Sequence, residues 1–289
     1  MAGYFEPSLS YMGTMSMIDK DAFSLRIFFP SGDPEGLRFI TKPLWTGQGI
    51  VFPRAIYEDV RELDELENTG VYILWEYVPQ GYLPRVYIGE SDSLKTRLNH
   101  HNNNKDFWTH CVVFFSKDKF LDKANIRYLE ARLVRLADEA KRCELAGVAV
   151  PKVPTLDQAD EADAESYLRD MLLCLPVMGI RFFEKPDKPS DITNILHLSG
   201  KGVEARGFEG SSGFTVLAGS QAVKETVPTI PGHLKELRHD LQKNGTLEEK
   251  DSFFEFGQDY TFGSSSAAAG FVLGGAVSGP KAWKKKRPR

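Results

Sequence analysis

The chain has 289 residues, of which 42% are hydrophobic and 26% are charged, and its formal net charge is -4. These values are typical of a soluble globular protein long enough for two or three domains. No apolar run approaches the length of a membrane span and no basic-then-apolar leader is present, so we expect no membrane partner. The three cysteines, at positions 111, 143 and 174, are odd in number and widely separated, which favours reduced thiols and a cytoplasmic location.

Residues 1–66 are predicted to form a separate β-rich unit. Apolar segments at 23–29, 37–40 and 50–52 are separated by turn-forming residues, a pattern typical of a small curled sheet or barrel. Trp45 lies in a tight connection between strands, where it either packs or stacks on a base.

Two tripeptides, Gly70-Val71-Tyr72 and Tyr87-Ile88-Gly89, lie on the predicted arms of a β-hairpin. Because side chains alternate along a strand, Tyr72 and Tyr87 share one face if the hairpin keeps its register through the loop. Gly89 has no side chain, which leaves room for a phosphate group or for the next element.

A helix is predicted to follow, because small polar residues precede the apolar positions within 94–98. Arg97 and His101 are four residues apart and therefore face the same way on this helix, so both can lean over the tyrosine face. A third strand is expected at 111–115, with His110 at its start.

A longer amphipathic helix is predicted over residues 122–140. Apolar residues recur at helical spacing from Ile126 to Leu136, and Asp122 is the expected cap. Glu130 lies beside this apolar stripe rather than opposite it, which is the position from which a carboxylate can face inward.

Taken in order, these residues resemble the catalytic module of the GIY-YIG nuclease family over residues 67–153. The resemblance implies an α+β fold in which a small antiparallel sheet is flanked by helices. The catalytic residues that it implies are Tyr72, Tyr87, Arg97, His101 and Glu130. Glu130 would be the single metal-binding carboxylate, and His110 falls, like His101, where some homing-type members place histidines. We expect further substrate contacts from His110, Lys95 and Arg127.

The chemistry expected of such a site is metal-assisted phosphodiester hydrolysis. A divalent ion on one carboxylate and the forked cation of Arg97 would offset the charge that develops on the phosphate oxygens. Mg²⁺ suits a single carboxylate because it keeps several waters and is completed by substrate phosphate, and Mn²⁺ is an alternative. Tyr87 would deprotonate or orient the water, with His101 as the rival base, and Tyr72 would position phosphate or water.

Other readings are open for these residues. Taken singly, Tyr72 and Tyr87 could be half-buried strand tyrosines, and Glu130 could belong to a solvated helix charge pattern. A zinc site from the histidines at 100, 101 and 110 with Cys111 lacks the paired spacing of zinc ligands. No asparagine lies between Glu130 and position 194, although the family usually carries one there. The alternative function is therefore a catalytically impaired nucleic-acid-binding or protein-interaction protein.

Two further segments complete the predicted organisation. Residues 154–190 form a helical connector whose first turns are acidic, and residues 191–289 form a C-terminal α+β domain. This domain resembles a domain of unknown function often found behind GIY-YIG modules in bacterial proteins. Its serine-rich helix start near position 264 either holds a phosphate or, as we favour, packs closely on a sheet. The basic tail, residues 284–289, is either a frayed end or a source of phosphate contacts.

The sequence therefore predicts a Mg²⁺-dependent DNA endonuclease, a hydrolase whose flanking domains select the substrate. Basic side chains between positions 85 and 135 are expected to form a local basic face, whereas acid concentrates at 157–170. RNA as a substrate and the oligomeric state are left open by the sequence.

Overall fold

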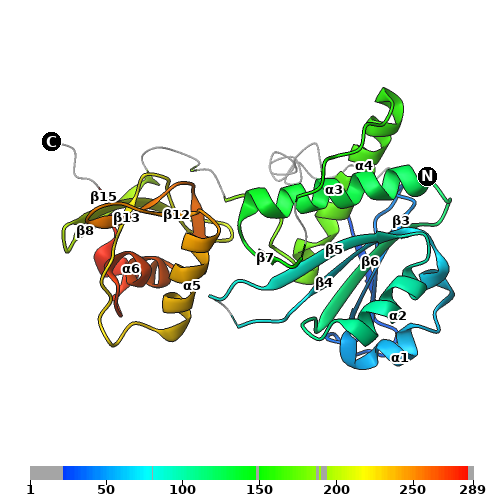
Figure 1. Ribbon diagram of the computed structural model, residues 1–289, viewed down its shortest axis with the longest axis horizontal. Coiled ribbons are helices and arrows are strands. Elements are labelled where there is room, and N and C mark those ends of the chain that lie inside the picture. Colours follow the sequence, from blue (N-terminus) through cyan, green and yellow to red (C-terminus); the bar gives the residue numbers. More distant parts are fainter. Residues whose placement is uncertain (1–21, 80, 148–149, 187–188, 190–193, 286–289) are drawn as a thin grey trace, which may run out of the picture.

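The computed structural model describes residues 22–79, 81–147, 150–186, 189 and 194–285. The fold is mixed α+β and consists of two lobes that lie side by side along the long axis (Figure 1). Within the described ranges, no helix is both long enough and apolar enough to cross a membrane.

The N-terminal lobe is built on one seven-stranded sheet with the strand order β1-β2-β3-β6-β4-β5-β7. Its strands are β1 (Arg26–Phe28), β2 (Arg38–Thr41), β3 (Gly47–Pro53), β4 (Gly70–Trp75), β5 (Arg85–Ser91), β6 (His110–Ser116) and β7 (Glu144–Leu145). Neighbouring strands are antiparallel, apart from the parallel pair β5 and β7.

The first three strands extend the central sheet and do not form a sheet of their own. β3 pairs with β6 along its whole length, from Gly47 opposite Ser116 to Pro53 opposite His110. β3 is buried at all but its last residue, because it pairs with β2 and β6 at its two edges and both faces of the sheet are covered. The expected unit 1–66 therefore shares its sheet with the segment that follows, and residues 1–21 lie outside the described part.

Helices cover both faces of this sheet (Figure 1). Side chains alternate along β4, so that Val71 and Ile73 join a core with α3 and α4, whereas Tyr72 and Leu74 join a core with α1 and α2. The helices of this lobe are η3 (Arg54–Ile56), α1 (Tyr57–Val60), η4 (Asp64–Glu67), α2 (Leu94–Asn104), α3 (Lys123–Ala140), α4 (Gln158–Cys174) and η5 (Pro176–Met178).

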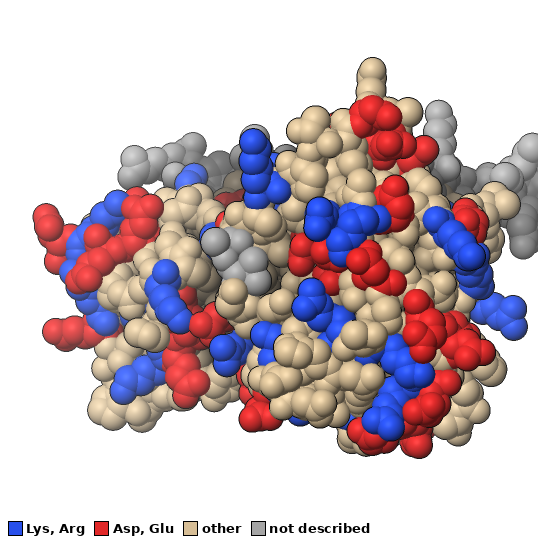
Figure 2. All heavy atoms as spheres, turned by 45° about the vertical axis from the view of Figure 1, so that its right-hand side comes forward, with Lys and Arg blue, Asp and Glu red and all other residues tan. Residues whose placement is uncertain are grey.

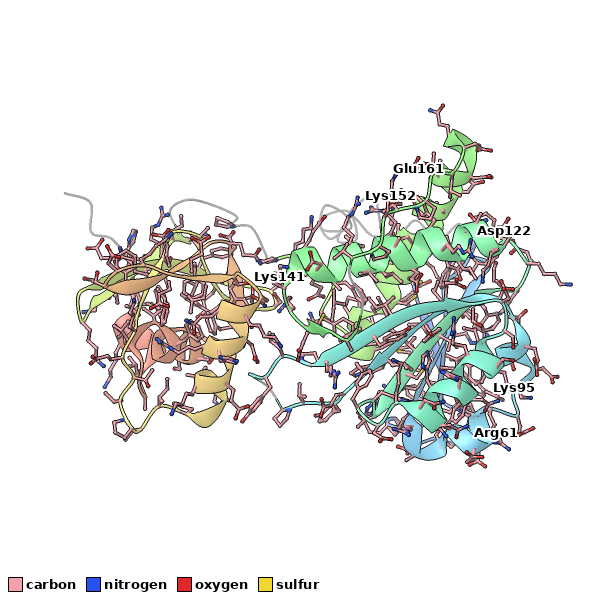
Figure 3. The ribbon with its side chains drawn as sticks, viewed as in Figure 1. Arg61, Lys95, Asp122, Lys141, Lys152 and Glu161 are labelled. Atoms are coloured by element: carbon pink, nitrogen blue, oxygen red, sulfur yellow. The ribbon has the colours of Figure 1, made fainter. Side chains whose placement is uncertain are left out.

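Polar caps define where the three long helices begin. The Asp122 carboxylate accepts a hydrogen bond from the Asn125 N–H at 2.9 Å, which confirms the predicted start of α3. Asp122 and Lys141 mark the two ends of this helix in Figure 3.

On α4, Tyr167 donates a hydrogen bond to the Phe115 carbonyl at 2.9 Å. The helical connector thus packs directly on the first sheet.

The C-terminal lobe has two sheets and its own core. A five-stranded sheet has the order β14-β10-β9-β8-β15, and a three-stranded sheet has the order β11-β13-β12. The strands are β8 (Leu196–Gly200), β9 (Val203–Gly210), β10 (Gly213–Val216), β11 (Gln221–Val223), β12 (Leu247–Glu249), β13 (Phe253–Phe256), β14 (Tyr260–Phe262) and β15 (Lys284–Lys285). The helices are α5 (Gly232–Lys243), α6 (Ser265–Leu273) and α7 (Gly279–Ala282).

The serine-rich start of α6 is used for close packing. A Cβ atom on Gly279 would lie 2.3 Å from the backbone carbon of Ser265, so α7 approaches α6 at a distance that only glycine permits. The Ser266 hydroxyl accepts a hydrogen bond from the Gly279 N–H at 3.0 Å, and Trp283 Nε1 donates to the Ser265 carbonyl at 3.0 Å. These contacts support the packing role over phosphate binding.

Candidate active site

The two tyrosines come from adjacent strands and stack on each other. Tyr72 lies opposite Gly89, and Tyr87 lies opposite Leu74, so the hairpin places both rings on the face covered by α2. Their ring centres are 6.1 Å apart and their planes differ by 24°. A Cβ atom on Gly89 would lie 2.3 Å from the Tyr72 hydroxyl oxygen. The space beside Gly89 therefore holds this hydroxyl and not a phosphate group, which corrects the expectation from sequence.

His101 of α2 completes an aromatic cluster with the two tyrosines. Its Nε2 lies 2.7 Å from the Tyr72 hydroxyl oxygen, and its ring centre lies 5.1 Å from that of Tyr87. The side chain is 3% exposed, and its Nδ1 has no hydrogen-bond partner among the described residues. Burial, together with the positive charges of Lys105 and Arg97, lowers the His101 pKa to about 4. The imidazole is thus neutral at pH 7.

Tyr72 is held in its protonated form. Burial raises the pKa of this tyrosine far above its usual range, the neighbouring Tyr87 and Glu130 raise it further, and Arg97 opposes them. With 1% exposure and a hydroxyl already hydrogen-bonded to His101, Tyr72 is placed to position other groups.

Tyr87 is the more accessible tyrosine, and a lysine that the sequence assigned only to the basic face lies over it. Tyr87 is half-buried, and the Lys105 Nζ lies 4.2 Å from its ring centre. Lys105 is the C-cap of α2, just past the residues that helical periodicity assigns to a face. Its backbone is fixed by Arg54, whose Nη1 donates to the Lys105 carbonyl at 3.0 Å.

Glu130 reaches the same region from α3. Burial raises the pKa of its carboxyl group, the Glu90 carboxylate raises it further, and Arg97 is the largest opposing charge. Because Glu130 and Arg97 both shift the pKa of Tyr72, the carboxylate, guanidinium and phenol act on one another. Tyr72, Tyr87 and His101 are thus in contact, and the charges of Arg97 and Glu130 act on Tyr72. The five residues predicted as catalytic come from β4, β5, α2 and α3.

The three residues expected to contact substrate are placed differently. Lys95 of α2 forms an ion pair with Glu67 at 3.1 Å on the outer side of the helix (Figure 3). Arg127 lies 3.8 Å from Glu90 on the α3 side of β5. His110 stacks on Trp75, with ring centres 5.5 Å apart, on the opposite face of the sheet from Tyr72. None of these three is brought to the tyrosine cluster.

The donor set near Glu130 fits Mg²⁺ better than Zn²⁺. Among the described residues, no group of three or more His, Cys, Asp or Glu side chains is positioned to hold a metal ion. A half-buried carboxylate whose pKa is raised by burial and by a second carboxylate is under-compensated, which favours a cation beside it. Mg²⁺ accepts such a sparse set, because waters and phosphate oxygens fill its remaining positions, whereas structural zinc needs four protein ligands.

Three cations on the tyrosine face lack an acidic partner in the described part of the chain: Arg85, Arg97 and Lys105. The Arg85 guanidinium carbon lies 5.0 Å from the Phe107 ring centre, next to the Tyr87–Lys105 pair. Figure 2 shows that basic and acidic side chains are interspersed over the face in view, with no large area of one sign. The local excess of positive charge is therefore small and lies near the tyrosines.

Comparison with known proteins places only the C-terminal lobe. Residues 196–289 match a family model described as a domain of unknown function, DUF4357. No curated protein and no solved structure matches the chain.

Proposed function

We propose that the N-terminal lobe is a Mg²⁺-dependent endonuclease of the GIY-YIG type that hydrolyses phosphodiester bonds in DNA. The observation that carries this proposal is the contact of Tyr72, Tyr87 and His101, together with the charges of Arg97 and Glu130 that act on Tyr72. Four successive long elements, β4, β5, α2 and α3, supply these side chains. The proposal gives each side chain a role in phosphodiester hydrolysis.

The division of labour follows from burial and contacts. Tyr87 is the accessible tyrosine and, as its phenolate, accepts the proton of the attacking water, while Lys105 places a positive charge over its ring. Tyr72 and the neutral His101 pack against the Tyr87 ring and hold it in place, and they do not exchange protons with the substrate. Arg97 is exposed and binds a non-bridging phosphate oxygen. Glu130 would hold Mg²⁺, which supplies positive charge at the scissile phosphate when bound.

DNA as the substrate is supported by the unpaired cations of the tyrosine face. Arg85, Arg97 and Lys105 carry no acidic partner in the described ranges, so each is available for a phosphate. Phosphate contacts of this kind bind every sequence alike, which leaves selection to other parts of the chain.

The test is nicking of supercoiled plasmid by purified full-length protein in Mg²⁺ and in EDTA. We expect nicking in Mg²⁺, none in EDTA and none by Glu130→Ala. Glu139→Gln, on the exposed side of the same helix, is the matched control and should cut like the wild type. Nicking that persists in Glu130→Ala would contradict the proposal and indicate a contaminating enzyme.

One observation favours the second candidate, a nucleic-acid-binding protein that does not cut. The asparagine usual in this family is missing after Glu130. That candidate predicts salt-sensitive retention of DNA by the wild type without any nicking in Mg²⁺ or Mn²⁺, so the same protein preparation separates the two functions.

A further inference from the structure

A basic cavity lies at the far end of the C-terminal lobe, on strands β8 and β15. It has a volume of about 380 Å³ and no acidic residue lines it. The Ser199 hydroxyl lines it together with four basic side chains, those of His197, Lys281, Lys284 and Lys285. None of the four side chains forms an ion pair or hydrogen bond with another described residue.

The strand register extends this cavity into a row of polar and basic side chains. Lys284 of β15 lies directly opposite His197 of β8, and His197 lies directly opposite Arg206 of β9. Side chains at such paired positions point to the same face of a sheet and neighbouring strands are about 4.8 Å apart. Glu204 shares this face and forms no ion pair with Arg206.

Two lysines of the basic tail are part of the fold. Lys284 and Lys285 form β15 and pair with His197 and Leu196, so they are held at the cavity by strand hydrogen bonds. This placement differs from the frayed end favoured from the sequence. Residues 286–289, which continue the basic sequence, lie outside the described part.

We propose that this row and cavity form a second nucleic-acid-binding surface that holds the phosphate backbone of DNA away from the cleavage site. Charges repeated across an open sheet face fit an extended polyanion better than a single small anion. A membrane surface fits poorly, because no large hydrophobic side chain of β8, β9, α7 or β15 is strongly exposed. The choice of DNA over another polyanion rests on the proposed function.

The position of this surface gives it a role in substrate choice. In Figure 1, β8 and β15 lie at one end of the long axis, and α2, which carries Arg97 and His101, lies at the other. A DNA molecule that binds at both ends of the protein must cross both lobes. The surface therefore increases affinity for long DNA without touching the scissile phosphate.

The experiment compares two double variants of the full-length chain, each carrying Glu130→Gln to prevent cleavage. Lys281→Gln/Lys284→Gln removes two charges from the cavity, and Lys224→Gln/Lys250→Gln removes two lysines that are ion-paired with Glu249 and Glu248 in the same lobe. Binding of a labelled DNA duplex is measured by anisotropy over a series of salt concentrations. Arg206→Gln provides an independent variant on β9.

We expect the cavity variant to weaken binding about tenfold and to reduce the slope of log affinity against log salt by roughly two, because each phosphate contact contributes about 0.9. Arg206→Gln should reduce the slope by about one, and the Lys224/Lys250 variant should bind like its parent. With Glu130 restored, the cavity variant should have a raised KM and an unchanged kcat.

Unchanged affinity and slope in both the cavity variant and Arg206→Gln would overturn the proposal. Retention on vesicles of anionic lipid, with no retention of duplex, would overturn it in favour of a membrane partner. Failure of the proposed function is distinct, because it would leave the salt-dependent difference between the variants intact while wild-type protein fails to cut.

Discussion

Tyr72 and Tyr87 are chemically identical and only 6.1 Å apart, yet their surroundings give them different roles. Tyr72 is buried, its hydroxyl is paired with His101, and its raised pKa keeps it protonated. Tyr87 is half-buried and lies under a lysine. In the proposed reaction the base must reach the water that attacks the phosphate, so accessibility favours Tyr87 for that role.

Cleavage kinetics separate the two aromatic candidates for the base. We expect Tyr87→Phe to lower kcat by about 10² to 10⁴, which is the usual contribution of a general base. His101→Asn should lower it less, because this imidazole acts through Tyr72. If the histidine change alone abolishes cutting while Tyr87→Phe remains active, the assignment of Tyr87 is wrong.

The buried imidazole also links stability to pH. Its pKa falls from 6.5 in the unfolded chain to about 4 in the folded protein, so the unfolded state binds the extra proton between these values. Stability from this group is complete above pH 6.5 and is lost as pH falls toward 4, by about 2 kcal/mol at pH 5. Urea unfolding at pH 7 and pH 5 should show this loss in the wild type and in His100→Asn, but a smaller loss in His101→Asn. Equal losses of stability in all three proteins would contradict this link between His101 and pH.

Strand and helix periodicity predict which residues of the candidate site share a face, but they do not predict every residue that lies beside the site. The alternation of β4 and β5 predicts the tyrosine pair, and the spacing of four predicts that Arg97 and His101 face together. Lys105 has no such signal, because it follows the last helical residue and reaches Tyr87 only through the tertiary packing of α2.

At the scale of elements, α2 is the part whose position controls the site, since it carries Arg97, His101 and the Lys105 cap. Arg54 ties its C-terminal end to the sheet, with hydrogen bonds from Nε to the Asn102 side chain, from Nη2 to the Asn102 carbonyl and from Nη1 to the Lys105 carbonyl. Two of the acceptors are helix C-terminal carbonyls, which have no partner within the helix.

Removing the hydrogen bonds of Arg54 to the end of α2 should affect both stability and cleavage. We expect Arg54→Met to cost about 2–3 kcal/mol in the free energy of unfolding, because hydrogen bonds to a charged group are lost. It should also lower kcat, because His101 and Lys105 move with the helix end. Arg61→Gln, which breaks only surface ion pairs, is the control and should change stability by less than about 1 kcal/mol. A variant that unfolds like this control would show that Arg54 does not hold the helix.

Helix boundaries were more predictable than strand partners. Caps such as Asp122 and Asp157 are local signals, and α3 and α4 begin where those caps indicate. The pairing of β3 with β6 joins residues more than fifty positions apart, and hydrophobic alternation identifies a strand without naming its neighbour. For that reason the first strands are predicted as a separate unit but join the central sheet.

At the scale of the whole molecule, the hairpin of β4 and β5 contacts both lobes. Beyond the tyrosines, its loop meets the C-terminal lobe, where the Tyr82 and His233 ring centres are 6.0 Å apart and Leu83 packs against the second core. An ion pair from Lys243 to Glu144, at 2.8 Å, joins the lobes at β7. The loop that joins the strands of Tyr72 and Tyr87 is therefore in direct contact with the domain proposed to bind DNA away from the cut.

The most direct test of the central claim is the single-turnover rate of cleavage of a labelled duplex as a function of Mg²⁺ concentration, for wild type and Glu130→Gln. The account predicts a rate that rises with Mg²⁺ and saturates in the wild type, and no cleavage by Glu130→Gln at any concentration. Equal rates in the two proteins, or a wild-type rate that does not depend on the metal, would contradict it.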